Sequence, residues 1–249
     1  MVNERDKMEY AVLMAICDKA LPMGCGAISQ LLASQGHNIS EATIGRMLRS
    51  MDHQGFTVKT GFQGRLLSAR GKVRAAHLEN LLKSRQWGEE FASALRGQTK
   101  KHLQEVLVAR RAIEGELAYL AAVNPAKGES KVLLEALEAQ RQALAIGGGA
   151  AAEDADFHAV LSRMARNRVL EAAILLIRQD TQLSPVLEYI RRHVHSLVYI
   201  DHQKIAEAVI CGRPDEARRA MVGHINNLIK DVEKYWKLIG AQSMGKERG

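Results

Sequence analysis

Apolar residues recur at helical spacing along almost the whole chain, and this period limits the fold more than any other feature. In the second half it covers six segments: 99–123, 130–146, 151–165, 168–195, 200–211 and 215–238. Aromatic residues make up only 4% of the chain, and helix formers outnumber strand formers. We therefore expect a mainly α protein whose C-terminal part is an all-α bundle of about six helices.

One stretch departs from this period. Residues 56–68, FTVKTGFQGRLLS, alternate in polarity around a glycine-flanked turn, which predicts a β-hairpin. Three helices are expected before it, at 6–20, at 27–36, and from the N-cap Ser40 to a stop at Gly55. Three short helices followed by a hairpin predict an N-terminal winged helix-turn-helix.

Positive charge is concentrated in the same region. The chain carries a formal charge of +7, and residues 40–85 hold nine Lys or Arg against three acids. Such a local excess is typical of a nucleic-acid contact, although a solvated basic face or a winged helix used for protein contacts would show it too. We expect the third helix and the hairpin to contact a double-stranded DNA operator through Ser40, Thr43, Arg46, Arg49, Lys59 and Arg65.

Glycines and turn residues divide the chain into four expected segments. These are a winged-helix domain at 1–70, a linker helix and connection at 71–98, an all-α domain at 99–240, and a flexible tail at 241–249. The linker is expected to lose its helical pattern around Gly88 and Gly97.

Three cysteines without a CxxC pair favour idle thiols over a disulfide framework or a thiolate zinc site. No apolar run approaches the roughly 20 residues that cross a bilayer, and the first residues lack the apolar core of a signal peptide. We therefore expect a soluble cytoplasmic protein with no membrane partner.

Asp154 and His158 are four residues apart in AAEDADFHAV, so they would share one face of a helix. A solvated surface pair is the alternative. His202 and His224 each lie eleven residues from residue 213, on either side of the CGRP turn. If the two flanking helices form an antiparallel hairpin, each histidine lies about 16 Å from the turn and the two face each other. Three imidazoles and one carboxylate would suit divalent zinc, nickel, manganese or iron.

Three segments in this order resemble a known family. VLVARRAIEGELAYLAA, DADFHAVLSRMARNRVL and HQKIAEAVICGRPDEARRAMVGH are similar to the signature segments of the FCD domain, the ligand-binding domain of FadR-type GntR regulators. SEATIGRMLRSMDHQGF followed by GRLLSARGK resembles winged-helix domains of bacterial and archaeal regulators, in an atypical, NrpR-like form. The third helix does not read like the SRTPVREAL of the usual GntR reader domain.

The resemblance to FCD domains implies a metal held by Asp154, His158, His202 and His224, with zinc expected first. It also implies a small organic acid effector that faces Arg110, and an asparagine, Asn167, that borders the pocket. Two alternatives stay open for the arginine: Arg111 could take its place, or Arg110 could form only a salt bridge to Glu114. His193 or His195 could replace one of the assigned metal ligands.

A DNA-reading unit joined to a ligand-binding bundle predicts a one-component transcription regulator. We expect a homodimeric repressor, not an enzyme, whose operator binding changes with the effector. A metal-dependent enzyme of small organic acids is the first alternative, although the sequence holds no HExxH motif. The second alternative is a regulator whose metal is structural or is itself the signal.

Overall fold

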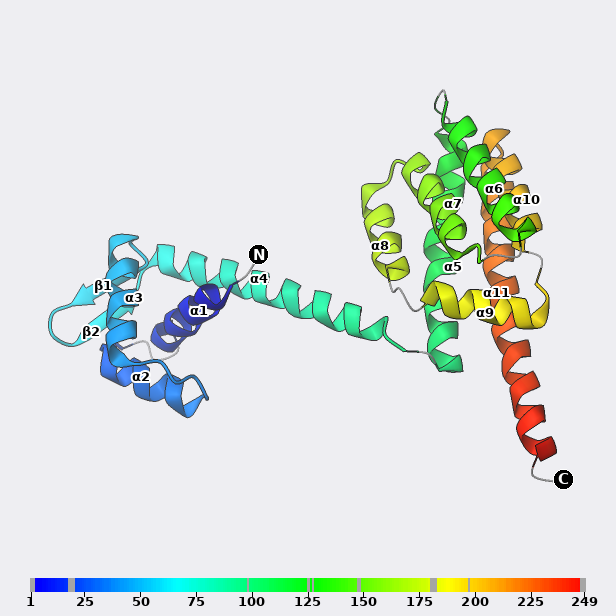
Figure 1. Cartoon of the computed structure of the whole chain (residues 1–249). Helices are drawn as coiled ribbons and strands as arrows, with labels where there is room; N and C mark the ends of the chain where they lie inside the picture. The colour runs from blue at the N-terminus through cyan, green and yellow to red at the C-terminus, as the bar shows by residue number, and fades with distance from the viewer. Residues whose placement is uncertain are drawn as a thin grey trace. The chain divides into compact units, whose positions relative to one another are not determined.

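A computed structural model describes residues 3–17, 21–97, 99–124, 126, 128–146, 149–179, 183–196 and 198–246. The chain divides into two compact units, Met1–Phe91 and Ala92–Gly249, and each is considered by itself (Figure 1). The N-terminal unit contains α1 (Glu4–Cys17), α2 (Cys25–Ser34), α3 (Glu41–His53), β1 (Thr57–Thr60), β2 (Gly64–Leu67) and most of α4 (Ala69–Ala94). The C-terminal unit contains α5 (Lys100–Val123), α6 (Glu129–Ala145), α7 (Ala151–Met164), α8 (Arg168–Arg178), α9 (Leu183–Val194), α10 (Val198–Ile210) and α11 (Pro214–Lys246).

The mainly α fold and the winged helix-turn-helix are confirmed. The side chain of Ser40 accepts a hydrogen bond from the backbone N–H of Thr43 and so caps α3. The apolar face of α3 packs with α1, α2 and α4 into one core, which includes Leu13, Leu32, Leu48 and Leu78. The strands β1 and β2 pair antiparallel with Thr57 opposite Leu67, which makes the wing.

A close backbone approach fixes the base of the wing. Met23 and Arg65 form an antiparallel bridge, and their backbone groups exchange hydrogen bonds of 3.0 Å. Gly64, next to this bridge, has a φ of 127°, and a Cβ there would lie 2.3 Å from the carbonyl carbon of Met23. Only glycine fits at this position, because a side chain would collide with backbone that cannot move away.

The helix α4 is longer than the sequence predicted. It continues through Gly88 to Ala94, where we expected the helical pattern to break. Gly88 is exposed, and a Cβ added there would meet no atom of the described residues within 4 Å. Side-chain hydrogen bonds from Arg85 to Glu89 and from Gln86 to Glu90 span this glycine along the helix. Good helix formers on both sides therefore outweigh the roughly 1 kcal/mol that a glycine costs inside a helix.

The C-terminal unit is an all-α bundle in which α5 and α11 pack along each other (Figure 1). Two boundaries differ from the sequence prediction. The segment 168–195 forms two helices, α8 and α9, and Pro185 lies in the first turn of α9, where proline is tolerated because no intrahelical partner is lost. The helix α11 continues to Lys246, through most of the expected flexible tail; 247–249 lie outside the described residues.

No helix in the described part of the chain is both long enough and apolar enough to cross a membrane.

Candidate metal and effector site

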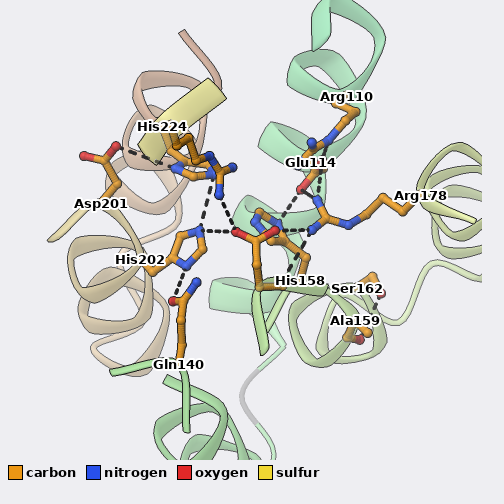
Figure 2. Close-up of polar contacts among 12 residues, drawn as sticks. Arg110, Glu114, Gln140, His158, Ala159, Ser162, Arg178, Asp201, His202 and His224 are labelled. Atoms are coloured by element: carbon orange, nitrogen blue, oxygen red, sulfur yellow. Dashed lines mark hydrogen bonds and ion pairs between the residues drawn. The ribbon is translucent and has the colours of Figure 1, made fainter. Parts of the chain in front are cut away.

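Three histidines from three helices meet in the core of the C-terminal unit (Figure 2). His158 lies on α7, His202 on α10 and His224 on α11, and none is more than 4% exposed. A ring nitrogen of each lies within 4.8 Å of the other two, and Nε2 of His202 is 3.3 Å from Nε2 of His224. The predicted α10–α11 hairpin, closed at Gly212 with a φ of 61°, is thereby confirmed. We call these three residues the histidine triad.

A side-chain oxygen faces the Nδ1 atom of every histidine in the triad. His202 Nδ1 lies 2.7 Å from Oε1 of Gln140 on α6, and His224 Nδ1 lies 3.6 Å from Oδ2 of Asp201. His158 Nδ1 contacts a carboxylate oxygen of Glu114 on α5. Oxygens placed in this way favour the tautomer with the proton on Nδ1 and leave each Nε2 with a free lone pair.

The triad is held in the neutral form that binds metals. Burial lowers the pKa of His158 to about 4, helped by the positive charge of Arg178 and opposed by Glu114. Burial also lowers the pKa of His202 and of His224. Near pH 7 all three imidazoles are therefore uncharged.

The donor set fits a divalent metal. Two Nε2 lone pairs 3.3 Å apart repel each other unless a proton or a cation lies between them. Nε2 of His158 has no hydrogen-bond partner among the described residues, although the ring is buried. Neutral imidazoles whose Nδ1 atoms are fixed by oxygens are the usual ligands of zinc and related metals.

Asp154, the fourth predicted ligand, lies beside the triad but is held by two arginines. Its Oδ1 is 3.7 Å from Nε2 of His202 and 3.1 Å from Nη1 of Arg191, and its Oδ2 is 2.8 Å from Nη2 of Arg178. Burial raises the pKa of Asp154, but Arg191, His158 and Arg178 outweigh burial and hold the pKa well below its usual range. Asp154 is therefore a carboxylate, as a metal ligand must be.

Arg110 and Glu114 extend this buried network. Nε of Arg110 donates to Oε1 of Glu114 over 2.6 Å, and Arg178 Nη1 lies 3.3 Å from both Glu114 oxygens. Burial raises the pKa of Glu114, but Arg110, His158 and Arg178 hold it well below its usual range. Three guanidinium groups (Arg110, Arg178, Arg191) face two carboxylates (Glu114, Asp154), so the network carries one unit of excess positive charge.

A cavity of about 540 Å³ adjoins this network. It is lined by Arg110, Gln140, Asp154 and Arg191 together with apolar side chains such as Leu187. Arg110 is 2% exposed, and its Nη2 has no hydrogen-bond partner among the described residues. A small molecule with an anionic group in this cavity would balance the excess positive charge, and the volume is in the range of small-ligand pockets.

The two candidate arginines lie in different surroundings. Arg111 Nη1 donates to Oδ1 of Asn226, and Arg111 lines a different surface pocket with Val108 and Val222. Arg110 forms the salt bridge to Glu114 and also lines the cavity.

Several functional candidates were missed by sequence reasoning. Arg178, Arg191, Gln140 and Asp201 contact the predicted ligands, yet none lies at ligand spacing from them in the sequence. Arg178 follows Ile174 by four residues and Ile177 by one, at the edge of the apolar face of α8. A charged residue in such a position is the one signal that could have pointed to it.

Comparisons with known proteins cover the same part of the chain. Residues 105–227, which include the triad, Asp154 and Arg110, match the FCD domain. The chain is 29% identical over 136 residues to the HTH-type transcriptional repressor NanR of Citrobacter rodentium, which covers 54% of this chain and 51% of NanR. It is 28% identical over 140 residues to the Uxu operon regulator of Haemophilus influenzae, covering 52% and 53%. The chain belongs to the FadR type of the GntR family.

The chain spans about half the length of these curated relatives. Residues 10–74 match the ribonuclease R winged-helix domain, which agrees only loosely with the NrpR-like form that we expected there. Among solved structures, Escherichia coli McbR/YncC aligns with 95% of this chain and 100% of its own, at 14% identity and a TM-score of 0.49.

In this GntR-family chain, five of the six residues predicted to contact DNA lie on accessible parts of α3 and the wing. Arg46 and Arg49 are exposed on α3, and Lys59 is exposed on β1. Ser40 is the N-cap of α3 and contacts the side chain of Thr43. Thr43 Oγ1 also accepts a hydrogen bond from Arg46 over 3.2 Å.

Arg65 differs from this expectation. Its Nε lies 2.9 Å from both carboxylate oxygens of Asp52, and its Nη2 lies 2.8 Å from Oδ2, so the guanidinium is engaged with the end of α3. Thr57 donates to the same carboxylate over 2.6 Å. Arg65 therefore ties the wing to α3, and it is not a free phosphate contact.

Asn167 also differs from its predicted role in the effector pocket. Its side-chain oxygen accepts hydrogen bonds from the backbone N–H groups of Val169 and Leu170, so it caps α8. It is not among the residues that line the 540 Å³ cavity. Asparagine is a favoured N-cap residue, which accounts for it without an effector.

Proposed function

We propose that this protein is a DNA-binding transcription repressor whose C-terminal bundle binds a divalent metal and a small carboxylate effector. The observation that carries the proposal is the position of the histidine triad beside a cavity lined by Arg110, whose buried Nη2 has no hydrogen-bond partner among the described residues. A metal at the triad and a guanidinium at the wall would together hold a carboxylate.

Three neutral imidazoles with Asp154 alongside form a donor set that suits zinc first, with nickel, manganese or iron as alternatives. A bound divalent ion would supply a Lewis acid that attracts an anionic oxygen of the effector. Gln140, Asp201 and Glu114 would keep the three Nε2 atoms directed at the ion.

The N-terminal unit supports the DNA-reading half of the proposal. Arg46 and Arg49 are exposed on the third helix of a winged helix-turn-helix, the element that enters the major groove in such domains. We expect a homodimer that reads two half-sites on an operator. The effector would change operator affinity only if its own affinity differs between the DNA-binding conformation of the dimer and the other conformation.

Metal content and DNA binding test the proposal. His202→Ala and His224→Ala should each lower the bound metal of the purified protein, measured by elemental analysis, whereas His193→Ala, an exposed histidine on α9, should not. Arg46→Ala with Arg49→Ala should abolish retention of operator DNA in a gel shift at moderate salt. Undiminished metal in both triad variants would contradict the site.

A thermal-shift panel of small carboxylates, with and without a chelator, tests the effector. Binding raises the unfolding temperature, and the rise grows with the logarithm of affinity and of ligand concentration. Acids that stabilise the protein only with metal present, and that lose this effect in Arg110→Gln, support the proposal. Bound metal with no response to any acid, and no change in DNA affinity on chelation, would instead indicate a structural metal.

A further inference from the structure

Asp154 contacts two arginines, and metal binding by Asp154 would weaken these two contacts to different extents. Its Oδ2 faces Arg178, which Glu114 also holds, while its Oδ1 faces Arg191 and is the oxygen that lies toward His202 Nε2. The oxygen on the side of the triad is therefore the one that Arg191 occupies.

Arg191 has no second carboxylate among the contacts that the structure describes. Its side chain is 12% exposed, its Nη1 donates to Asp154 Oδ1 over 3.1 Å, and its Nε is buried without a hydrogen-bond partner among the described residues. Arg178, by contrast, contacts both Asp154 and Glu114. Arg191 is therefore bound by fewer carboxylate contacts than Arg178.

Arg191 and a metal at the triad would share one oxygen atom. Arg191 Nη1 lies 3.1 Å from Asp154 Oδ1, and the same oxygen lies 3.7 Å from His202 Nε2. A divalent cation carries twice the charge of a guanidinium, so it would displace Arg191 from this oxygen.

On the basis of the proposed function, we infer that Arg191 is a second effector-binding residue, which Asp154 holds until the triad takes a metal. When Asp154 Oδ1 becomes a metal ligand, Arg191 loses its partner. Arg191 already lines the cavity together with Arg110, so its guanidinium is placed to accept an anionic group there. The effector class is then a small acid with two anionic or strongly accepting groups, such as a dicarboxylate, that Arg110 and Arg191 bind together.

This arrangement couples the two ligands. The metal raises effector affinity by releasing Arg191, and the effector raises metal affinity by the same factor, because coupling between two binding equilibria is reciprocal. A purely structural Arg191 would behave in the opposite way. If Arg191 kept Asp154 oriented for the metal, its loss would weaken metal binding, as loss of an outer-shell partner does.

The sign of a single substitution therefore decides the question. Zinc affinity, measured by competition with a chelating dye in the full-length protein, should rise about tenfold in Arg191→Gln. Arg192→Gln is the matched control, because Arg192 is the next residue on α9, lines the same cavity and pairs with Glu188 instead of Asp154. It should leave zinc affinity within about twofold of the unsubstituted protein. Weaker or unchanged zinc binding in Arg191→Gln overturns the inference.

Two further variants keep the test decisive. In an Asp154→Asn background, Arg191→Gln should no longer raise zinc affinity, because the pair acts through Asp154. A gain that persists there would mean simple charge repulsion and would also overturn the inference. If Arg191→Gln does not fold, Arg191→Lys keeps the charge without the guanidinium fork and should show a smaller gain of the same sign.

Succinate serves as the acid probe. The apparent affinity of the zinc form for succinate is measured from its thermal stabilisation. This affinity should fall at least tenfold in Arg191→Gln and should not fall in Arg192→Gln. Equal affinity in the two variants overturns the effector role of Arg191. If the unsubstituted protein binds no zinc, the proposed function itself is wrong. If it binds zinc but Arg191→Gln and Arg192→Gln have the same zinc affinity, only this inference is wrong.

Discussion

The Nε2 atoms of His202 and His224 lie 3.3 Å apart, while the two Nδ1 atoms face Gln140 and Asp201. Both rings are buried, and 3.3 Å between the two nitrogens leaves no room for a water molecule between them. Two nitrogen lone pairs that could bind a metal therefore lie close together in the core. The residues around them determine how the protein should respond to acid and to metal.

Acid should destabilise the metal-free protein through the triad. The pKa of each triad histidine is lower in the folded protein than the ordinary value of 6.5, with His158 at about 4. The unfolded chain therefore binds more protons, and the stabilisation, fully present above pH 6.5, is lost as pH falls toward 4. Each histidine contributes a slope of up to about 1.4 kcal/mol per pH unit in this window.

Urea unfolding with a chelator at pH 7.5 and pH 5 measures this slope. His158→Gln should show a smaller loss between the two pH values, because a glutamine side chain does not titrate. Asp154 and Glu114 have lowered pKa values too, but they lose stabilisation only below their ordinary values near 4, outside the interval. An identical loss in the variant would contradict the buried, neutral state of His158.

Gln140→Leu should weaken metal binding although Gln140 is not a predicted ligand. The substitution removes the oxygen that fixes Nδ1–H of His202, and loss of such an outer partner typically costs about 10- to 100-fold in metal affinity. Gln142→Leu, an exposed position on the same helix, is the control. Zinc titration of the two variants should separate them, and equal affinities would count against the assigned orientation of His202.

Two glycines of α4 should respond oppositely to alanine. A Cβ at Gly71 would lie 2.1 Å from the carbonyl oxygen of Phe56, so Gly71→Ala should destabilise the N-terminal unit by about 2 kcal/mol. Gly88 has open space around it, and Gly88→Ala should stabilise α4 by about 0.5–1 kcal/mol. Thermal unfolding of both variants measures the difference. A destabilised Gly88→Ala would argue against a continuous α4.

Lys59 and Arg65 should separate DNA binding from stability. Arg65→Gln leaves Asp52 without its guanidinium partner and should lower the stability of the N-terminal unit by about 1 kcal/mol, since both side chains are partly exposed. Lys59→Gln should leave stability unchanged and reduce the salt dependence of DNA binding by about one phosphate contact. Fluorescence anisotropy at several salt concentrations, beside thermal unfolding, provides both readouts. If Arg65→Gln reduced the salt slope without loss of stability, Arg65 would be a phosphate contact after all.

The sequence by itself determined what depends on short-range spacing. The helical period, the Ser40 cap and the alternation before Gly64 are local signals, and they predicted the winged helix because neighbouring residues decide these elements. The spacing of Asp154 and His158, and the position of His202 and His224 about the turn, predicted correctly that the three histidines meet. Local signals failed where two of them competed, as at Gly88 and between α8 and α9.

Only the tertiary structure decided which charges face each other. Asp154, Arg178 and Arg191 come from α7, α8 and α9, and no sequence spacing relates the three side chains. The same holds for Arg65, whose place on the wing follows from the alternation but whose partner Asp52 follows from how β2 lies against α3. A buried charge is stabilised only by partners that packing brings to it, so its role depends on the whole fold.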